Sequence, residues 1–380
     1  MVYPKRPRTA ACHTTWRVAL ALLGIIILFP AAATARSGPL AWVQNVDTTD
    51  HPPHRLAADS AVRTSGAVGH QEERRALTGG DTMGTADVPD TARLTQAEYM
   101  YGGTPRHTLT GSLPYRTTQV SSNTITIFGG ALVALATGIT IYQQKWYPDS
   151  TLQHFHFIAD WTYSREVDKL GHAFGGWMSA YCSHEALIAS GLSQEDAALW
   201  GAVGGLFFQT FIEVQDGFHA WGFDWTDETG NIFGAGYYLA QQRVPTLQNF
   251  DPKWSVGPTG RDSAREAAQI RSRLIVDDYD RQDIWLSVKL HNLLPPNLQP
   301  YWPKWLQLAI GAGARDVELR GYRSYRVIHL SLDYNLPELL PDLGPFGNWL
   351  VQSLNAFHLP APALQLWPTV KFELIYPFHF

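Results

Sequence analysis

The polar residues that could do chemistry in this chain gather in one apolar region. They form three closely spaced pairs: Asp168 and His172, Glu213 and Asp216, and Asp227 and Asn231. Spacings of three and four residues place each pair on one face of a helix, and Lys169 stands beside the first pair. Ionisable groups in apolar surroundings are costly unless they are paired, coordinated or functional. We therefore expect these residues to form one cluster.

A catalytic interpretation of this cluster assigns the role of general base to His172 or Glu213, with Asp216 as a further catalytic residue. An imidazole or a carboxylate in apolar surroundings suits that role because its pKa is readily shifted. The substrate would be a lipid or another component of the cell envelope. The sequence has no GxSxG, GxxxxGK[ST] or HExxH motif, so a serine hydrolase, a P-loop NTPase and a zincin have no support.

Two other interpretations remain open, and with them the question whether the protein is an enzyme. The cluster could hold a divalent metal ion, because one imidazole and several carboxylates suit zinc, manganese or iron. The candidate ligands are His172, Glu213, Asp216 and Asp227. The cluster could instead be structural and fix the helix register of an envelope scaffold. The residues with orienting or structural roles are Asp168, Lys169, Asp227 and Asn231.

Three helices must position these residues. We predict the first over residues 165–190, ending at Gly191, and the second from Ser193 to about residue 214. The third begins at Asp224 and runs to about residue 242, and both later helices open with a capping-box pattern. Small residues recur every four positions, which predicts close helix packing. They are Gly171, Gly175 and Ser179, then Gly201 and Gly205, then Gly230 and Gly234.

These motifs also carry a family resemblance. The segments DKLGH at 168–172, EVQDGF at 213–218 and WGFDWTD at 221–227, with Asn231 and Gly234, resemble the YfiM-like predicted periplasmic lipoproteins of unknown function. They are more distantly similar to the VanZ-like membrane proteins. The resemblance covers about residues 120–242. It implies an envelope protein and a site, but no reaction, because that family has no established activity.

The N-terminus predicts export. Basic residues precede an apolar run over residues 18–29, and Ala33-Thr34-Ala35 follows as a cleavage pattern, so residues 1–35 are predicted to be a signal peptide. The mature protein would be periplasmic or membrane-associated, with the outer membrane as one option. Residues 36–118 are poor in large apolar side chains and are predicted to be a disordered linker.

The region 119–243 is predicted to be the helical domain. Within it, residues 125–142 carry no charge and could form either a short transmembrane helix or a buried core helix. The interfacial side chains that follow, Lys145 and Trp146, favour membrane contact. Membrane or envelope lipids are therefore the expected partners, and the sequence identifies no protein partner.

Residues 244–380 are predicted to be strand-rich after a proline-containing connector over 244–275. Apolar residues alternate with polar ones near 284–290, 306–310 and 328–334 and again at the C-terminus. The terminal aromatic strand is also typical of outer-membrane barrels, but about four strands are too few for one. The predicted fold is mainly α, a compact helical bundle with a C-terminal α+β portion of about four antiparallel strands.

Charge composition excludes one class of function. Only 17% of the 380 residues are charged, with 29 basic against 34 acidic residues. No basic excess is available to neutralise phosphates, so we expect no nucleic-acid partner.

Overall fold

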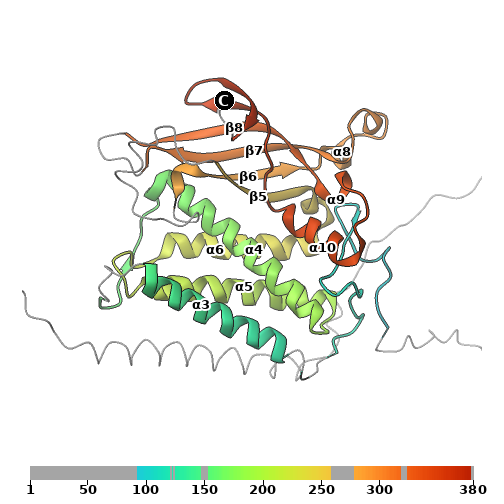
Figure 1. The fold of residues 1–380 in the computed structure, drawn as a ribbon, viewed down its shortest axis with the longest axis horizontal. Helices are drawn as coiled ribbons and strands as arrows, with labels where there is room; N and C mark the ends of the chain where they lie inside the picture. Colours follow the sequence, from blue (N-terminus) through green and yellow to red (C-terminus); the bar gives the residue numbers. More distant parts are fainter. Residues whose placement is uncertain are drawn as a thin grey trace, which may run out of the picture.

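The computed structural model describes residues 92–119, 122, 125–146, 153–257, 278–317 and 323–377. In Figure 1 a group of helices lies below a sheet formed by the C-terminal part of the chain. The predicted signal peptide, residues 1–35, and the first part of the predicted linker, residues 36–91, lie outside the described residues.

The helices of the lower group are α3 (Gly130–Trp146), α4 (Val167–Ala189), α5 (Gln194–Asp216) and α6 (Trp225–Arg243). The predicted caps are present. The Ser193 hydroxyl accepts a hydrogen bond from the Asp196 amide at the start of α5, and the Asp224 carboxylate accepts one from the Thr226 amide at the start of α6. Gly191 follows α4 with a φ of +103°, which favours glycine. These residues explain why α5 and α6 begin, and α4 ends, where they do.

Close approach between helix backbones depends on specific glycines. A Cβ at Gly234 of α6 would lie 1.9 Å from the carbonyl oxygen of Ala173 in α4, and a Cβ at Gly205 of α5 would lie 2.3 Å from the amide nitrogen of Ala180. Both glycines belong to the predicted small-residue pattern. Gly171 does not contribute, since a Cβ there would meet nothing within 4 Å. Glycine therefore brings α5 and α6 against the same helix, α4.

The sheet is antiparallel and has the order β10-β9-β8-β7-β6-β5. Its strands are β5 (Phe250–Val256), β6 (Gln282–Val288), β7 (Leu306–Arg315), β8 (Tyr325–Tyr334), β9 (Ala361–Trp367) and β10 (Lys371–Tyr376). The predicted combination of helices and C-terminal antiparallel strands is confirmed, but the predicted number of four strands is wrong, because the sheet has six. The missed strands, β5 and β9, contain Pro252 and Pro362, which argue against a strand in a sequence. β5 is an edge strand, where proline is tolerated.

The remaining elements are short. A π-helical turn (Ile125–Gly129) precedes α3, and single turns of 3-10 helix cover Tyr163–Glu166, Pro245–Asn249, Tyr279–Arg281 and Gln299–Tyr301. Short strands pair as β1 (Met100–Tyr101) with β2 (Thr104–Pro105) and as β3 (Phe157–Ile158) with β4 (Phe223–Asp224). The C-terminal helices are α8 (Leu290–Leu293), α9 (Leu336–Leu339) and α10 (Gly344–Leu354).

The end of the predicted linker packs onto the helices. Arg106 is 3% exposed, and its guanidinium lies 2.9 Å from a carboxylate oxygen of Glu185 in α4 and 3.1 Å from the Tyr238 hydroxyl in α6. A buried charge is tolerated because it is paired and hydrogen-bonded. The prediction of a disordered linker is therefore wrong for residues 92–118. Composition alone did not reveal the buried partner.

The glycine contacts make a testable prediction with a matched control in one helix. We expect Gly234→Ala to lower the free energy of unfolding by about 1–3 kcal/mol, because the new methyl group meets the α4 backbone. Gly236→Ala, where a Cβ meets nothing within 4 Å, should raise it by about 0.5–1 kcal/mol. Chemical denaturation of both variants measures the difference. Equal effects of the two substitutions would contradict the close α4–α6 packing.

Candidate functional site

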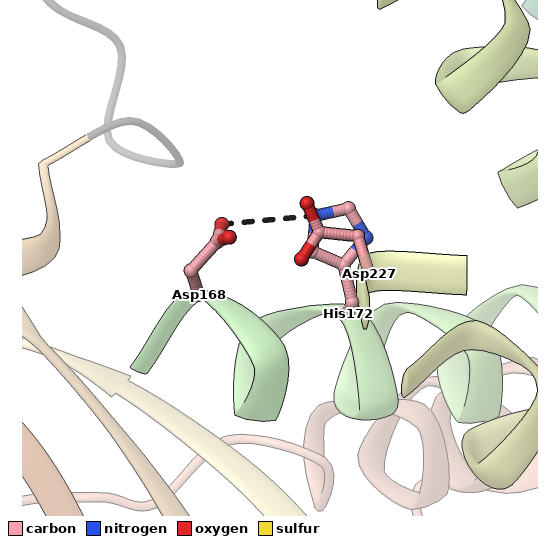
Figure 2. A group of neighbouring side chains, drawn as sticks. All are labelled: Asp168, His172 and Asp227. Atoms are coloured by element: carbon pink, nitrogen blue, oxygen red, sulfur yellow. Dashed lines mark ion pairs between the residues drawn. The ribbon is translucent and has the colours of Figure 1, made fainter. Parts of the chain in front are cut away.

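Three helix ends bring the predicted polar residues together. Asp168, Lys169 and His172 lie in the first turns of α4, and Glu213 lies in the last turn of α5. The start of α6 adds its cap, Asp224, followed by Asp227 and Asn231. In Figure 2, Asp168 and His172 project from one helix, and Asp227 reaches them from a neighbouring one. We call this set of seven residues the polar cluster.

The ammonium group of Lys169 is the centre of the cluster. Its Nζ atom lies 2.8 Å from Asp168 Oδ2, 3.2 Å from Asp224 Oδ2 and 2.6 Å from Asp227 Oδ1. None of these four side chains is more than 12% exposed. Burial alone would lower the pKa of Lys169, but the surrounding carboxylates raise it above its usual value. Lys169 therefore carries its positive charge in the folded protein.

The imidazole of His172 lies between two pairs of groups. Its Nδ1 atom is 3.2 Å from Asn231 Oδ1 and 3.4 Å from Glu213 Oε1. Its Nε2 atom is 3.7 Å from Asp168 Oδ1 and also 3.7 Å from Asp227 Oδ2. Burial lowers the pKa of His172, which favours the neutral ring. Since the amide oxygen of Asn231 only accepts hydrogen bonds, Nδ1 carries the proton and Nε2 presents its lone pair to the two carboxylates.

Burial and like charge set the protonation of the acids. Burial, reinforced by Asp227 and Asp216, raises the pKa of Glu213 to about 9. Burial and the neighbouring Asp168 raise the pKa of Asp227 to about 8, although Lys169 opposes this. The pKa of Asp168 is lowered, because His172, Lys169 and a hydrogen bond outweigh burial. At neutral pH the cluster thus holds protons on acids that are ordinarily ionised.

The hydrogen bond to Asp168 comes from a residue that sequence analysis missed. The hydroxyl of Tyr279, in the turn before β6, donates to Asp168 Oδ1 at 2.6 Å. Asp224 was noted only as a helix cap, yet its carboxylate also contacts Lys169. Its position three residues before Asp227 was a sequence signal for Asp224. No local signal exists for Tyr279, which is 111 residues from its partner.

Most of the predicted site residues meet at one place in the structure. Six of them converge: Asp168, Lys169, His172, Glu213, Asp227 and Asn231. Asp216 stands near enough to raise the pKa of Glu213. The set of ligand atoms that lie within 4.8 Å of one another consists of Asp168, His172 and Asp227. Asp168 thus takes the place that the predicted metal set gave to Glu213 and Asp216.

A cavity of about 70 Å³ lies elsewhere in the described part of the chain. Its walls include Arg106, Tyr181, Tyr238, Asp251 and Lys289, and none of the cluster residues lines it. Within the cluster, the side chain of His172 is 22% exposed.

One family model matches the chain. Residues 156–241 match a family described as "Predicted periplasmic lipoprotein (DUF2279)". The matched segment contains all seven residues of the polar cluster. The match confirms the resemblance seen in the sequence and agrees with the predicted location of an exported protein in the cell envelope. No curated protein and no solved structure matches the chain.

Among the described residues, one helix has the length and composition of a membrane span. Gln194–Asp216, the helix α5, is long and apolar enough to cross a membrane by length and composition alone, a test that core helices also pass. The predicted span over residues 125–142 includes only a shorter apolar helix. Membrane crossing by that segment therefore stays a prediction.

The raised pKa of Glu213 makes stability depend on pH. The folded protein keeps this proton up to about pH 9, whereas the unfolded chain loses it near 4.5. Stability should therefore fall as pH rises from 4.5 to 9, by up to about 1.4 kcal/mol per pH unit. Glu213→Gln keeps the volume and stays neutral, so its stability should fall less steeply. Thermal melts in the presence of a chelator measure both slopes.

The control is Glu195→Gln, which makes the same change at an exposed position of the same helix. It should keep the pH dependence of the wild type. If Glu213→Gln also keeps that dependence, Glu213 is ionised in the folded protein and our account of its protonation is wrong.

Proposed function

We propose that this protein binds a divalent metal ion through Asp168, His172 and Asp227 and uses it to hydrolyse or transfer a group on an amphiphilic substrate of the cell envelope. One observation carries the proposal: three ligand atoms of suitable type lie within 4.8 Å of one another. Imidazole with carboxylates suits zinc, manganese or iron.

The spacing of the ligand atoms fits a metal after a small contraction. The Nε2 atom of His172 is 3.7 Å from each carboxylate oxygen. A tetrahedral zinc site with bonds of about 2.0–2.2 Å has edges of about 3.3–3.6 Å between ligands. Small side-chain rotations would therefore bring the two histidine–carboxylate distances to these values, and all three ligand atoms already lie within 4.8 Å of one another.

Surrounding groups are arranged as partners of metal ligands usually are. The amide oxygen of Asn231 accepts a hydrogen bond from Nδ1 of His172, which leaves Nε2 free to bind a metal. Tyr279 donates to Asp168, and Lys169 holds the other carboxylate oxygens of Asp168 and Asp227. Such contacts orient metal ligands and tune their basicity. In this proposal Glu213, 3.4 Å from Nδ1, positions His172 rather than acting as the general base.

The charge of the cluster favours a cation. One ammonium group faces the carboxyl groups of Asp168, Asp224 and Asp227, with Glu213 beside them. The lone pair of Nε2 and two carboxylate oxygens point toward one another, which is unfavourable unless a proton or a metal ion lies between them. Three protein ligands also leave a coordination position for water, as catalytic zinc sites do.

Exposed aromatic side chains beside the cluster support an amphiphilic substrate. Trp225, two residues before Asp227, stacks on Phe157 with ring centroids 5.4 Å apart. The two side chains are 55% and 57% exposed. Tyr163, whose ring centroid is 5.8 Å from Lys169 Nζ, is also exposed. An apolar surface next to a charged centre fits a molecule with an apolar and a polar end.

A specific observation also favours a structural role. Lys169 already neutralises part of the negative charge of three carboxylates, and a buried ion network can fix helix register without catalysis. In that case the protein would be an envelope scaffold, and the cluster would bind no metal.

A measurement of metal binding distinguishes the metal-dependent function from the structural role. Titration calorimetry of the full chain with Zn²⁺ or Mn²⁺, followed by dialysis and elemental analysis, should show one bound ion per chain. Asp227→Asn and His172→Gln should each weaken binding by about 100-fold or more, because each removes a ligand. Asp216→Asn changes an acid outside the ligand set and should bind like the wild type. A wild type that binds no divalent metal, or an Asp227→Asn variant that binds normally, would contradict the metal centre.

Activity is a separate prediction. Metal-loaded wild-type protein incubated with an extract of envelope lipids should release a product that mass spectrometry detects. Asp227→Asn, although folded, should release none, and a chelator should stop the wild-type reaction. Product formation that is unchanged in the variant would exclude the cluster as the active site, whereas metal binding without any product would restrict the site to a structural role.

A further inference from the structure

The six-stranded sheet has its polar side buried and its apolar side exposed over β6 to β10, whereas at β5 the apolar side packs against α4 through Trp254 and Phe174. A row of paired residues crosses all strands: Pro252, Leu286, Ile310, Leu330, Leu364 and Phe372. The neighbouring row on the opposite side includes Asp251, Ser287, Ser331 and Glu373, which are all buried. Antiparallel sheets with one solvated face usually show the reverse polarity.

The buried side is a connected polar interior. Lys253 is fully buried, with its Nζ atom 2.7 Å from Asp333 Oδ2 and 2.8 Å from the Tyr334 carbonyl oxygen. The ring of His358 stacks on Trp285 at a centroid distance of 3.9 Å. These contacts fix which way the strands face, because turning β8 over would expose Asp333, the partner of Lys253, and bury Leu330 in its place.

The outer face of the sheet is consequently apolar and exposed. We define it by Leu286, Ile310, Ile328, Leu330, Phe372 and Leu374. Their side chains are 37% to 65% exposed. Contiguous apolar surface of this kind marks an interaction site.

Hydrocarbon is the occupant that this face fits. None of its six side chains can form a hydrogen bond, and the charged residue on the same side of β8, Arg326, is paired with Glu166. Protein interfaces instead usually combine an apolar centre with a polar rim and several hydrogen bonds. The strands pair with one another, so the face presents few unsatisfied backbone groups. Trp367, at the end of β9 and 57% exposed, offers an indole at the border, where aromatic rings favour the membrane interface.

We propose that the outer face of the sheet rests in the acyl region of a lipid bilayer and attaches the protein to one leaflet without crossing it. This orientation brings the polar cluster close to the membrane surface. Arg326 of β8, two residues before Ile328, pairs with Glu166, two residues before Asp168. The inference rests on the sheet and is independent of metal binding.

Two exposed phenylalanines provide a matched test. Phe372 on the outer face is 64% exposed, and Phe233 on helix α6 is 66% exposed. In the full chain with Cys12→Ser and Cys182→Ser, Phe372→Cys and Phe233→Cys would each carry a polarity-sensitive fluorophore. Vesicles of phosphatidylcholine and phosphatidylglycerol with nitroxide-labelled acyl chains should quench the label at 372 at least fivefold more strongly than the label at 233. Adding Leu330→Glu, which places a charge on the outer face, should abolish this difference.

Equal quenching at the two positions, or none at 372, would overturn the proposal. A blue shift of the label at 372 that grows with protein concentration and without vesicles would also overturn it, because a second copy of the chain would then cover the face. Circular dichroism of each labelled variant confirms that the fold is intact. The Leu330→Glu side chain points away from the polar interior, so loss of folding is not expected.

Discussion

The buried ammonium group of Lys169 is the interaction on which the arrangement of the helices around the cluster depends. It joins Asp168 of its own helix to Asp224 and Asp227 at the start of α6. Removing one partner from a buried ion pair leaves an uncompensated charge, at a cost of about 3–5 kcal/mol. Burial raises the pKa of Glu213 and of Asp227, and one ammonium group does not balance the acids gathered around it, so protons remain on both residues.

Close helix packing is the condition for this network. A Cβ at Gly230 would lie 2.8 Å from the Lys169 carbonyl oxygen and 3.0 Å from the His172 Cβ atom. Because glycine leaves that space empty, α6 approaches α4 closely enough for Asn231 to reach the imidazole. The polar cluster therefore depends on the glycines, because backbone proximity allows short polar side chains to meet.

Local sequence signals predicted those parts of the structure that are determined locally. Caps at Ser193 and Asp224 gave the helix starts, and four-residue spacings gave the cluster. Alternation gave four strands, but prolines at residues 252 and 362 concealed two others. Arg106 and Tyr279 were missed because their partners are distant in sequence. Alternation also cannot tell which side of a strand is buried, and that choice depended on the ion pair of Lys253 with Asp333.

The helices and the sheet both bury charged groups by pairing them with opposite charges, but the consequences differ. In the helices, the polar cluster occupies one end of the bundle and stays partly open at His172, whose side chain is 22% exposed. In the sheet, buried ion pairs such as Lys253 with Asp333 lie on the inner side, and apolar residues face outward. The contacts of Glu166 with Arg326 and of Asp168 with Tyr279 connect the start of α4 to β8 and to the turn before β6. A surface that holds the sheet against lipid would therefore also set the distance of the polar cluster from that lipid, because the Glu166–Arg326 ion pair and the Tyr279–Asp168 hydrogen bond tie the start of α4 to the sheet.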